Sequence, residues 1–492
     1  MHIQSNPSAK KAVFSYNPQD AQVAKPQTTE IDTVRLGGAP ATDKVQLRNF
    51  FLVTDIFGRP TGLEPDASLK LNANADGQFV FNEGSLDYTA ANSFAAAAKT
   101  VQIFDEKMQQ YTGKSIKWAF NEDQLGIAPN AGAKLPQPMP NAFYTRFAFE
   151  EGGPEQGNLF FFDYPNAAGK NTSTGNSGEV VSHEAGHAIL DALRPNYFTS
   201  MAFEAGAFHE AFGDMVSMLV SMENDQVLDK VVEQTGGDLS NPNILAELGE
   251  EMGKSIGRSA VRDNRNNFKY VDPDTLPEEA PDNRLARESH SFARVWTGAF
   301  YELMDSISDD YRAKGAEPKE ALQKAAQEGW RLLVGQMDNS TEGSFVTFRG
   351  MAESMLEGDR KVNGGERQEM ITKVFTGRQI LPRGLNLEHG ITASVERGEL
   401  REMSFQLGDK FGDLSGVTVK AHNERGIFAA DDDAIKQKAL EKEVARLAAN
   451  GDIFIPEEGH KATLADFFRP DGSHYHAYLD RDANELKRVP LS

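Results

Sequence analysis

Apolar residues recur at helical spacing in five stretches of the chain, which predicts five helices. The first stretch is rich in alanine and is followed by Gly113, a residue type that often ends helices. The second stops at Pro195, because proline cannot continue a helix. The third is apolar on all sides, so we expect that helix to be buried. The predicted helices cover residues 89–111, 179–193, 206–222, 290–304 and 317–334.

Shorter apolar runs between turn residues predict strands in other parts of the chain. Asp431-Asp432-Asp433 precedes a sixth helical stretch that ends near residue 449. We interpret these aspartates as a helix start and not as a metal site, because acidic groups in a first turn complement the helix dipole. His474 and His476 would share one face of a strand, and we expect a partly exposed strand end there. The predicted strands lie within residues 45–57, 78–81, 159–162 and 384–425.

The composition narrows the classes of partner. The 492 residues include 51 Lys and Arg against 73 Asp and Glu, a formal net charge of −22. This acidity argues against a nucleic-acid partner and against an anionic membrane surface. The chain has no cysteine, which excludes disulfides, thiol nucleophiles and cysteine-bound metals.

The N-terminus is polar, and no apolar run reaches the length of a membrane span. We therefore expect a cytoplasmic protein by default, or one exported by a route that needs no signal. The sequence does not determine the oligomeric state.

The motif with the most chemical content is His183-Glu184-Ala185-Gly186-His187, within the second predicted helix. Residues four apart lie on one face of a helix, so the two imidazoles can bind one zinc ion. Glu184 stands beside the first histidine, where its carboxylate can accept a proton from a zinc-bound water. The motif therefore predicts a zinc site with its own general base.

A third ligand is expected in the next helix, where Glu210 and Asp214 are four residues apart. Carboxylates in an apolar helix are costly to bury unless they bind a metal or a polar partner. We expect Glu210 to be the third ligand and Asp214 to accept a hydrogen bond from a zinc-bound histidine. A structural salt bridge is the alternative. His209 projects about 100° away from Glu210 around the helix, which disfavours it as a ligand.

Four segments, in the same order along the chain, resemble the thermolysin family of zinc endopeptidases. The first is similar to the family's edge strand that pairs with substrate, and the second to its zinc helix. The third is similar to the helix with the distal glutamate ligand, and the fourth to the helix with the catalytic histidine. The segments are 141–144, 179–187, 206–214 and 289–301, and the resemblance covers about residues 86–382.

The resemblance implies the chemical roles of five residues. His183, His187 and Glu210 would bind one zinc ion, and Glu184 would be the general base. His290 would stabilise the oxyanion that forms on the substrate carbonyl.

The resemblance also implies how a peptide substrate would be held. Arg262 would bind the substrate carbonyl after the scissile bond, with Arg258 as the alternative. Asn141 and Ala142 would hydrogen-bond the peptide main chain. Val261 would line a pocket for large apolar residues after the scissile bond.

The sequence departs from the family pattern at several positions. His209 stands where the family has asparagine. The family tyrosine that assists the oxyanion is out of register, and Tyr197 is the nearest candidate, with Phe198 beside it. The carboxylate that orients His290 is either Asp282 or Glu288.

The calcium chemistry of the family is not supported by this sequence. The family's paired calcium site uses a carboxylate just before the zinc helix, where Glu179 stands. The carboxylate seven residues after Asp214 is replaced by Ser221. We therefore expect a single zinc ion as cofactor and a weakened or lost calcium site.

These observations predict an α+β zincin fold, with a β-rich N-terminal lobe, a mainly helical second lobe and the zinc helix between them. The predicted activity is hydrolysis of internal peptide bonds in peptides or proteins by zinc-activated water. The alternative is a catalytically impaired zinc protein that recognises peptides. The predicted segments are a polar N-terminal arm with short strands that could be a prosegment (1–85), the β-rich lobe with the zinc helix (86–205), the helical lobe (206–382) and an accessory α+β domain (383–492).

Overall fold

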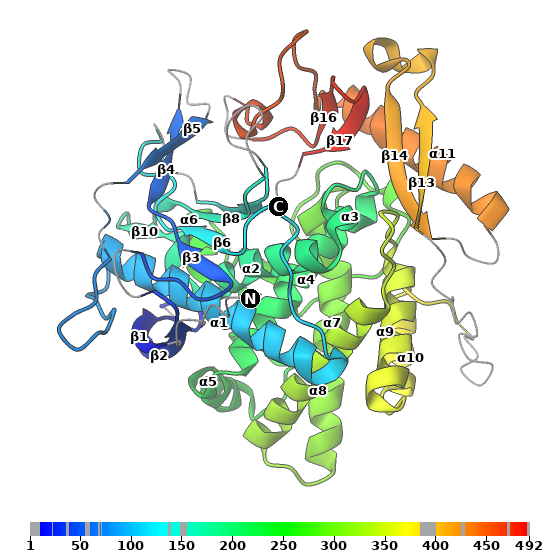
Figure 1. Cartoon of the computed structure of the whole chain (residues 1–492). Coiled ribbons are helices and arrows are strands. Elements are labelled where there is room, and N and C mark those ends of the chain that lie inside the picture. Colours follow the sequence, from blue (N-terminus) through cyan, green and yellow to red (C-terminus); the bar gives the residue numbers. More distant parts are fainter. Residues whose placement is uncertain are drawn as a thin grey trace, which may run out of the picture.

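The computed structural model has mixed α+β architecture, with 45% of residues helical and 17% in strands, as the sequence predicted. Long helices run through the middle of the molecule, and small sheets lie around them (Figure 1). The structure describes residues 10–21, 23–35, 39–54, 60–66, 69, 71–135, 138, 140–147, 155–383, 400–424, 429–469 and 473–489.

All five helices that the apolar spacing predicted within residues 89–334 are present, and each extends beyond its predicted bounds at one end at least. Ser85 caps the first one, and Gly113 ends it in the left-handed conformation that glycine tolerates best. The helices are α1 (Leu86–Thr112), α2 (Gly178–Leu193), α3 (Pro195–Phe198), α4 (Phe203–Met222), α5 (Asp225–Thr235), α6 (Glu250–Ser255), α7 (Ser289–Ala313), α8 (Pro318–Asn339), α9 (Phe348–Asn363), α10 (Gln368–Gly377) and α11 (Ala429–Ala449).

The strands form several small sheets. A four-stranded sheet has the order β3-β6-β8-β7, and a five-stranded sheet near the C-terminus has the order β13-β14-β17-β16-β15; the remaining strands pair as β1-β2, β4-β5, β9-β10 and β11-β12. The bounds are β1 (Lys10–Tyr16), β2 (Gln27–Thr33), β3 (Val45–Leu47), β4 (Phe50–Thr54), β5 (Pro60–Pro65), β6 (Leu125–Ala128), β7 (Ala142–Thr145), β8 (Asn158–Phe161), β9 (Asp163–Pro165), β10 (Asn171–Ser173), β11 (Glu247–Leu248), β12 (Arg262–Asp263), β13 (Leu400–Gln406), β14 (Thr418–Glu424), β15 (Ile453–Phe454), β16 (Ala477–Asp480) and β17 (Glu485–Arg488).

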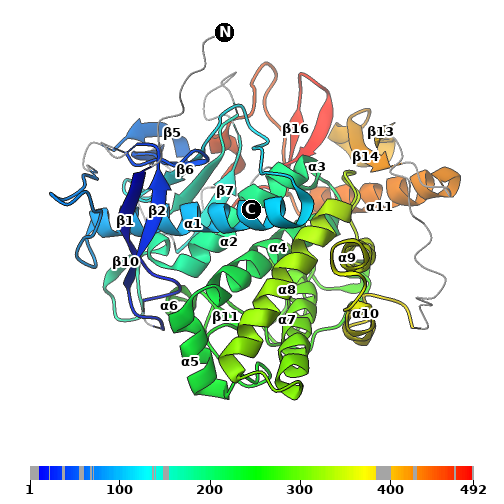
Figure 2. The same ribbon diagram turned by 60° about the horizontal axis from the view of Figure 1, so that its bottom comes forward.

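Helix α2 is the centre of the packing. It contacts α1 on one side and α4 on another, and α4 in turn packs against α7 (Figure 2). Nearly every residue of α4 is buried, as its all-round apolar sequence predicted. The two histidines of the motif therefore lie within the core and not on a surface helix.

The N-terminal residues differ from the loosely packed arm that their polar sequence suggested. Strands β1 and β2 form an antiparallel hairpin that packs against α1. Phe14 is fully buried and stacks on Phe79 with ring centroids 4.6 Å apart, and Phe94 of α1 lies beside it. Apolar side chains on one face of a short strand are enough to join it to a core. The run at 78–81 makes only an isolated bridge to β1 through Phe79.

The C-terminal region packs against the β-rich part of the molecule. Its strands and α11 lie along the top edge in Figure 1, coloured orange to red. Phe467, Phe468 and Tyr478 share a core with Phe143 and Phe160 of the four-stranded sheet. Of the strand-like runs predicted within 384–425, β13 and β14 are present, and residues 384–399 lie outside the described part. The helix predicted to start at the three aspartates starts two residues earlier, at Ala429.

Among the described residues, no helix combines the length and the apolar character needed to cross a membrane.

Candidate metal centre

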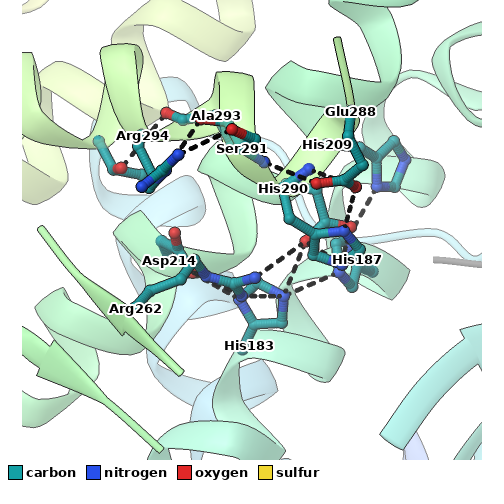
Figure 3. A network of polar contacts seen from close by, with 12 residues as sticks. His183, His187, His209, Asp214, Arg262, Glu288, His290, Ser291, Ala293 and Arg294 are labelled. Carbon is teal, nitrogen blue, oxygen red and sulfur yellow. Dashed lines mark hydrogen bonds and ion pairs between the residues drawn. The ribbon is translucent and has the colours of Figure 1, made fainter. Parts of the chain in front are cut away.

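The two motif histidines owe their position to the start of α2. Ser177 caps this helix and accepts a hydrogen bond from the Val180 backbone N at 3.3 Å. One turn and two turns further on, His183 and His187 lie on the same face, with their Nε2 atoms 3.0 Å apart (Figure 3). Both side chains are almost completely buried, so the core fixes their orientation.

Two glycines let α2 and α4 approach closely enough to share a site. A Cβ atom on Gly186 of α2 would lie 2.9 Å from the Cα of Gly213 on α4. A Cβ atom on Gly213 would lie 2.7 Å from the His183 ring. Because side chains at these positions would force the helices apart, the glycines set the distance between the motif and the carboxylates of α4.

Glu210 of α4 completes a buried group of three ligand atoms. Its Oε2 lies 3.5 Å from His183 Nε2, and its Oε1 lies 3.7 Å from His187 Nε2. All three residues offer ligand atoms within 4.8 Å of one another. A tetrahedral ion bound at about 2.0–2.2 Å requires ligand atoms roughly 3.3–3.5 Å apart, and the observed spacings of 3.0–3.7 Å bracket this value. The group therefore fits one small metal ion.

Asp214 and Arg262 surround the outer side of His183. Asp214 Oδ1 lies 2.9 Å from His183 Nδ1 and 2.9 Å from Arg262 Nη2. Arg262 Nη1 also lies 3.5 Å from Glu210 Oε2. Burial and Arg262 lower the pKa of His183, but Asp214 and Glu210 outweigh them and raise it to about 9. Asp214 thus occupies the supporting place that the sequence suggested, and Arg262 reaches the site.

His290 approaches the same centre from the first turn of α7. Its Nε2 lies 3.2 Å from Glu210 Oε2, and its Nδ1 lies 2.6 Å from Glu288 Oε1. Burial acts against the charged ring, yet Glu210 and Glu288 together raise the pKa of His290 to about 9. Glu288 also caps α7 by accepting from the backbone N atoms of His290 and Ser291. Of the two carboxylates left open by the sequence, Glu288 is therefore the one that holds His290.

The sequence left Asp282 open as the partner of His290 and Arg258 as the alternative to Arg262, but these two residues pair with each other instead. Asp282 pairs with Arg258 at 2.9 Å, and both side chains are about half exposed. This ion pair removes Asp282 as the partner of His290 and Arg258 as the arginine of the cluster.

His209 has a supporting role that the sequence did not reveal. Its Nδ1 lies 3.0 Å from His187 Nδ1, on the side of the ring away from Glu210 (Figure 3). Burial lowers the pKa of His209 to about 3 and that of His187 well below its ordinary value. The two neutral rings can share one proton, which would fix the tautomer of His187 with Nε2 free to bind a metal. The only signal in the sequence was that His209 stands where the family has asparagine.

Glu184 is buried, and its Oε2 has no hydrogen-bond partner among the described residues. Burial raises the pKa of Glu184 to about 7, while the charge of His183 opposes the rise and that of Glu210 adds to it. A carboxylate with a pKa near neutrality is well suited to accept and return a proton. Glu184 is thus a buried carboxyl beside His183 and Glu210 with a pKa near neutrality.

The segment expected to hold a peptide main chain forms an edge strand. Strand β7 is the last strand of its sheet and pairs with β8. Asn141 and Ala142, at its start, line a cavity of about 180 Å³ together with Glu210 and His290. Among the described strands β7 has no neighbour on its other side, and such a strand edge can pair with an extended peptide.

Val261 lines a second cavity, of about 910 Å³, which also reaches Arg262 and His290. The side chain of Val261 packs toward Gly249, where a Cβ atom would lie 3.0 Å from it. Apolar residues form only part of the cavity wall. The rest of the wall includes the charged residues Arg258, Asp263, Arg265, Glu278, Glu279, Asp282 and Arg294. The cavity thus offers less apolar surface than the family resemblance implied.

Tyr197 is not brought to the ligand cluster. Its hydroxyl donates to the Thr341 carbonyl at 2.6 Å and lies 3.8 Å from Met351 Sδ. The neighbouring ring of Phe198 instead packs on His209, with centroids 5.2 Å apart. Tyr197 lines the 180 Å³ cavity with Glu210 and His290, but its hydroxyl is engaged with Thr341.

His474 and His476 are not an isolated strand end. Both line the 180 Å³ cavity beside His290, together with Phe468 and Arg488. Nothing in their local sequence signals this position, because the packing of the C-terminal region creates it.

A second group of acidic residues lies at the start of α2. Asp20, Glu179 and Glu250 are buried and have carboxylate oxygens within 4.8 Å of one another. Neither oxygen of Glu250 has a hydrogen-bond partner among the described residues. Burial raises the pKa of all three, that of Glu250 to about 7. The sequence had indicated only Glu179, because Asp20 arrives from the N-terminal hairpin region.

The candidate metal centre therefore unites His183, His187 and Glu210 with four neighbouring residues: Glu184, Asp214, Arg262 and His290. Asn141, Ala142 and Tyr197 line the smaller adjoining cavity and Val261 lines the larger one, and the hydroxyl of Tyr197 is engaged with Thr341. No protein-family model and no curated protein matches this chain.

Proposed function

We propose that this protein is a zinc-dependent endopeptidase with a thermolysin-like arrangement of two lobes around α2. The observation that carries the proposal is the buried set of His183, His187 and Glu210, with the unpaired carboxylate of Glu184 beside it. Two imidazoles and one carboxylate are a ligand set typical of catalytic zinc, which leaves a fourth position for water. A purely structural zinc site would not need a general base at this place.

A zinc ion bound here would lower the pKa of a water and polarise the substrate carbonyl. Glu184 would accept a proton from the attacking water as the water oxygen bonds to the carbonyl carbon. The same carboxyl would then give this proton to the leaving nitrogen, and the carbon–nitrogen bond would break to yield a carboxylic acid and an amine. A carboxyl with a pKa near 7 can perform both transfers.

The cations of the cluster stabilise the negative charge that develops on the carbonyl oxygen. His290 is held in its protonated form by Glu288 and Glu210, and Arg262 is held by Asp214. Donors positioned for a developing oxyanion each contribute about 10²–10³ in rate. Since the hydroxyl of Tyr197 is engaged with Thr341, we assign this role to His290 and Arg262.

A peptide would bind in extended form along the edge of β7. Asn141 and Ala142 would hydrogen-bond its main chain, and residues after the scissile bond would enter the cavity of Val261 and Arg262. A strand edge recognises any extended segment, which favours cleavage of internal bonds. Charged residues line much of that cavity. A preference for large apolar substrate residues would therefore depend on contacts with Val261 and a few small neighbours.

The decisive experiment compares the wild type with Glu184→Gln on an unfolded protein substrate, both loaded with zinc. We expect equal zinc content, and activity lower by about 10²–10⁴-fold in the variant. Glu106→Gln, an exposed substitution on α1, is the matched control and should behave as the wild type.

Cleavage by neither protein, with one zinc ion per chain in both, would contradict the proposal. That result would favour the alternative of a zinc protein that binds peptides without hydrolysing them. Equal cleavage by both proteins would remove Glu184 as the base.

A further inference from the structure

Two cavities adjoin the candidate metal centre, one of about 180 Å³ and one of about 910 Å³. Both are lined by His290 and Glu288, but only the larger one is lined by Arg262 and Val261. Under the proposed function, residues after the scissile bond occupy the larger cavity. The smaller cavity therefore takes residues that precede the scissile bond.

The wall of the smaller cavity comes from two regions far apart in sequence. Asn141, Phe143 and His209 belong to the catalytic part, whereas Phe468, His474 and Arg488 belong to the C-terminal region. The contact between the regions is tight, because Phe468 lies 5.8 Å from Phe143 in the shared core. The C-terminal region is thus a fixed part of the substrate cleft.

Arg488, the last residue of β17, extends between the first turns of α4 and α7. Its Nη2 lies 3.4 Å from the Ser289 hydroxyl, and a Cβ atom on Gly206 would lie 2.6 Å from the same nitrogen. No ion pair of the described residues includes Arg488. Burial, opposed by more distant carboxylates at Glu443, Glu210 and Glu288, lowers the pKa of its guanidinium. Arginine nevertheless keeps its charge in proteins, so a cation faces this cavity without a direct counter-ion.

The carboxylates whose charges act on Arg488 are paired with other cations, and Glu443, the first of them, pairs with Arg287 and Arg446. Glu288 lines the cavity, but its two oxygens accept from the backbone and ring of His290 and from Ser291. Glu210 faces His183, His187 and His290. His474 and His476 add nitrogen atoms and no negative charge. A carboxylate that enters this cavity would therefore find donors and little repulsion.

We propose that Arg488 selects substrates with an aspartate or glutamate shortly before the scissile bond, an inference that rests on the proposed endopeptidase function. The guanidinium would bind the side-chain carboxylate in a charge-assisted, fork-like contact. A cavity of about 180 Å³ has room for one side chain and is smaller than a site for a drug-sized ligand. The C-terminal region would thus supply specificity to the active site.

The test uses blocked peptides that differ only by Glu or Gln at the first or second position before the cleaved bond. In the wild type we expect kcat/KM to be about tenfold or more higher for one of the Glu peptides, as a hydrogen bond to a charged group implies. Arg488→Gln should lower this ratio to below about twofold. Arg488→Lys keeps the charge and should retain part of the preference.

Lys487→Gln is the matched control, because it removes one positive charge from the neighbouring position of β17, where Lys487 pairs with Asp480. This variant should keep the full preference for Glu. A loss of preference in Lys487→Gln as well would assign the effect to general charge and overturn the role of Arg488.

Binding of the same peptides to Glu184→Gln, measured by fluorescence anisotropy, separates the two proposals. Cleavage of Glu and Gln peptides at equal rates by the wild type would overturn the role of Arg488 and leave the endopeptidase proposal intact. Absence of any cleavage would overturn the endopeptidase proposal. In that case equal affinity for both peptides would overturn the role of Arg488 too, and tighter binding of the Glu peptide would support it.

Discussion

Two buried clusters of titratable side chains include residues of α2, one at the start of the helix and one near its middle, and their charges are balanced in different ways. At the metal centre, the carboxylates of Glu210 and Asp214 face the cations of Arg262 and His290. At the start of the helix, Asp20, Glu179 and Glu250 face one another. No ion pair of the described residues joins these three acids to a cation.

The two clusters shift the pKa values of their carboxyl groups in opposite directions. Burial raises the pKa of Glu210, but His290, His187 and the other neighbours lower it well below its ordinary value. Burial raises the pKa of Glu179 far above its ordinary value, and Glu250 raises it further. A cluster with charges of both signs keeps its carboxylate ready for a metal, whereas a cluster of like charges must bind protons or a cation.

Removal of one metal ligand should have the largest effect. His187→Ala leaves two of the three protein ligands, too few for a tightly held catalytic zinc, so we expect loss of the metal and of all detectable peptidase activity. Zinc analysis after dialysis and a cleavage assay measure both. His460→Ala, a substitution at a histidine about two-fifths exposed, should change neither. Retention of one zinc per chain in His187→Ala would refute the ligand assignment.

Removal of a cation from the metal centre should impair catalysis without loss of metal. His290→Gln should lower kcat by about 10²–10³-fold at unchanged zinc content. Glu288→Gln should lower it in the same direction, because His290 loses its partner at 2.6 Å. Asp282→Asn is the comparison variant, since Asp282 pairs with Arg258, and it should have nearly wild-type kcat. A larger effect from Asp282→Asn than from Glu288→Gln would reverse our choice between the two acids.

A change in the distance between α2 and α4 should weaken zinc binding, but less severely than the removal of a metal ligand. Gly213→Ala places a methyl group against the His183 ring, and a disturbed ligand shell typically costs 10–100-fold in metal affinity. Competition with a zinc-binding dye measures the affinity. Gly377→Ala, where no atom lies within 4 Å of the new methyl group, should leave zinc binding unchanged. Unchanged affinity in Gly213→Ala would show that the helices can separate at little cost.

The acidic cluster should affect stability and its pH dependence more than activity. The pKa of Glu250 is about 7 in the folded protein against an ordinary 4.5, so the folded state holds this proton more tightly. Its stabilising effect is full below pH 4.5 and is lost as the pH rises through about 7. In the presence of a chelator, the free energy of unfolding of Glu250→Gln should equal that of the wild type at pH 5. At pH 8 it should exceed the wild-type value by about 2–3 kcal/mol.

Denaturant unfolding at the two pH values measures this difference, and Glu106→Gln should show none. A divalent cation would replace the bound protons, so calcium in place of the chelator should stabilise the wild type at pH 8 more than Glu250→Gln. If the wild type gained stability relative to Glu250→Gln between pH 5 and 8, the interpretation that the folded state holds the Glu250 proton more tightly would be wrong.

Local patterns in the sequence were sufficient for several long helices, though not for α5, α9 and α10, and for three residues that could hold a metal ion. The 3.6-residue periodicity located α1, α2, α4, α7 and α8, because that spacing depends only on residues close along the chain. The i, i+4 spacing of His183 and His187 placed both rings on one face for the same reason. The carboxylate pair of α4 was recognisable because charges in an apolar helix need partners.

The tertiary structure decided which partners those residues meet. It selected Glu288 and not Asp282 for His290, Arg262 and not Arg258 for the centre, and it turned Tyr197 toward Thr341. These choices depend on loop conformations and on segments more than a hundred residues apart, which no local pattern encodes. The same is true of Phe14 in the core, of Asp20 beside Glu179, and of Arg488 in the cleft. The sequence by itself determined the reactive groups, and long-range packing determined their neighbours, because burial and charge pairing act through space and not along the chain.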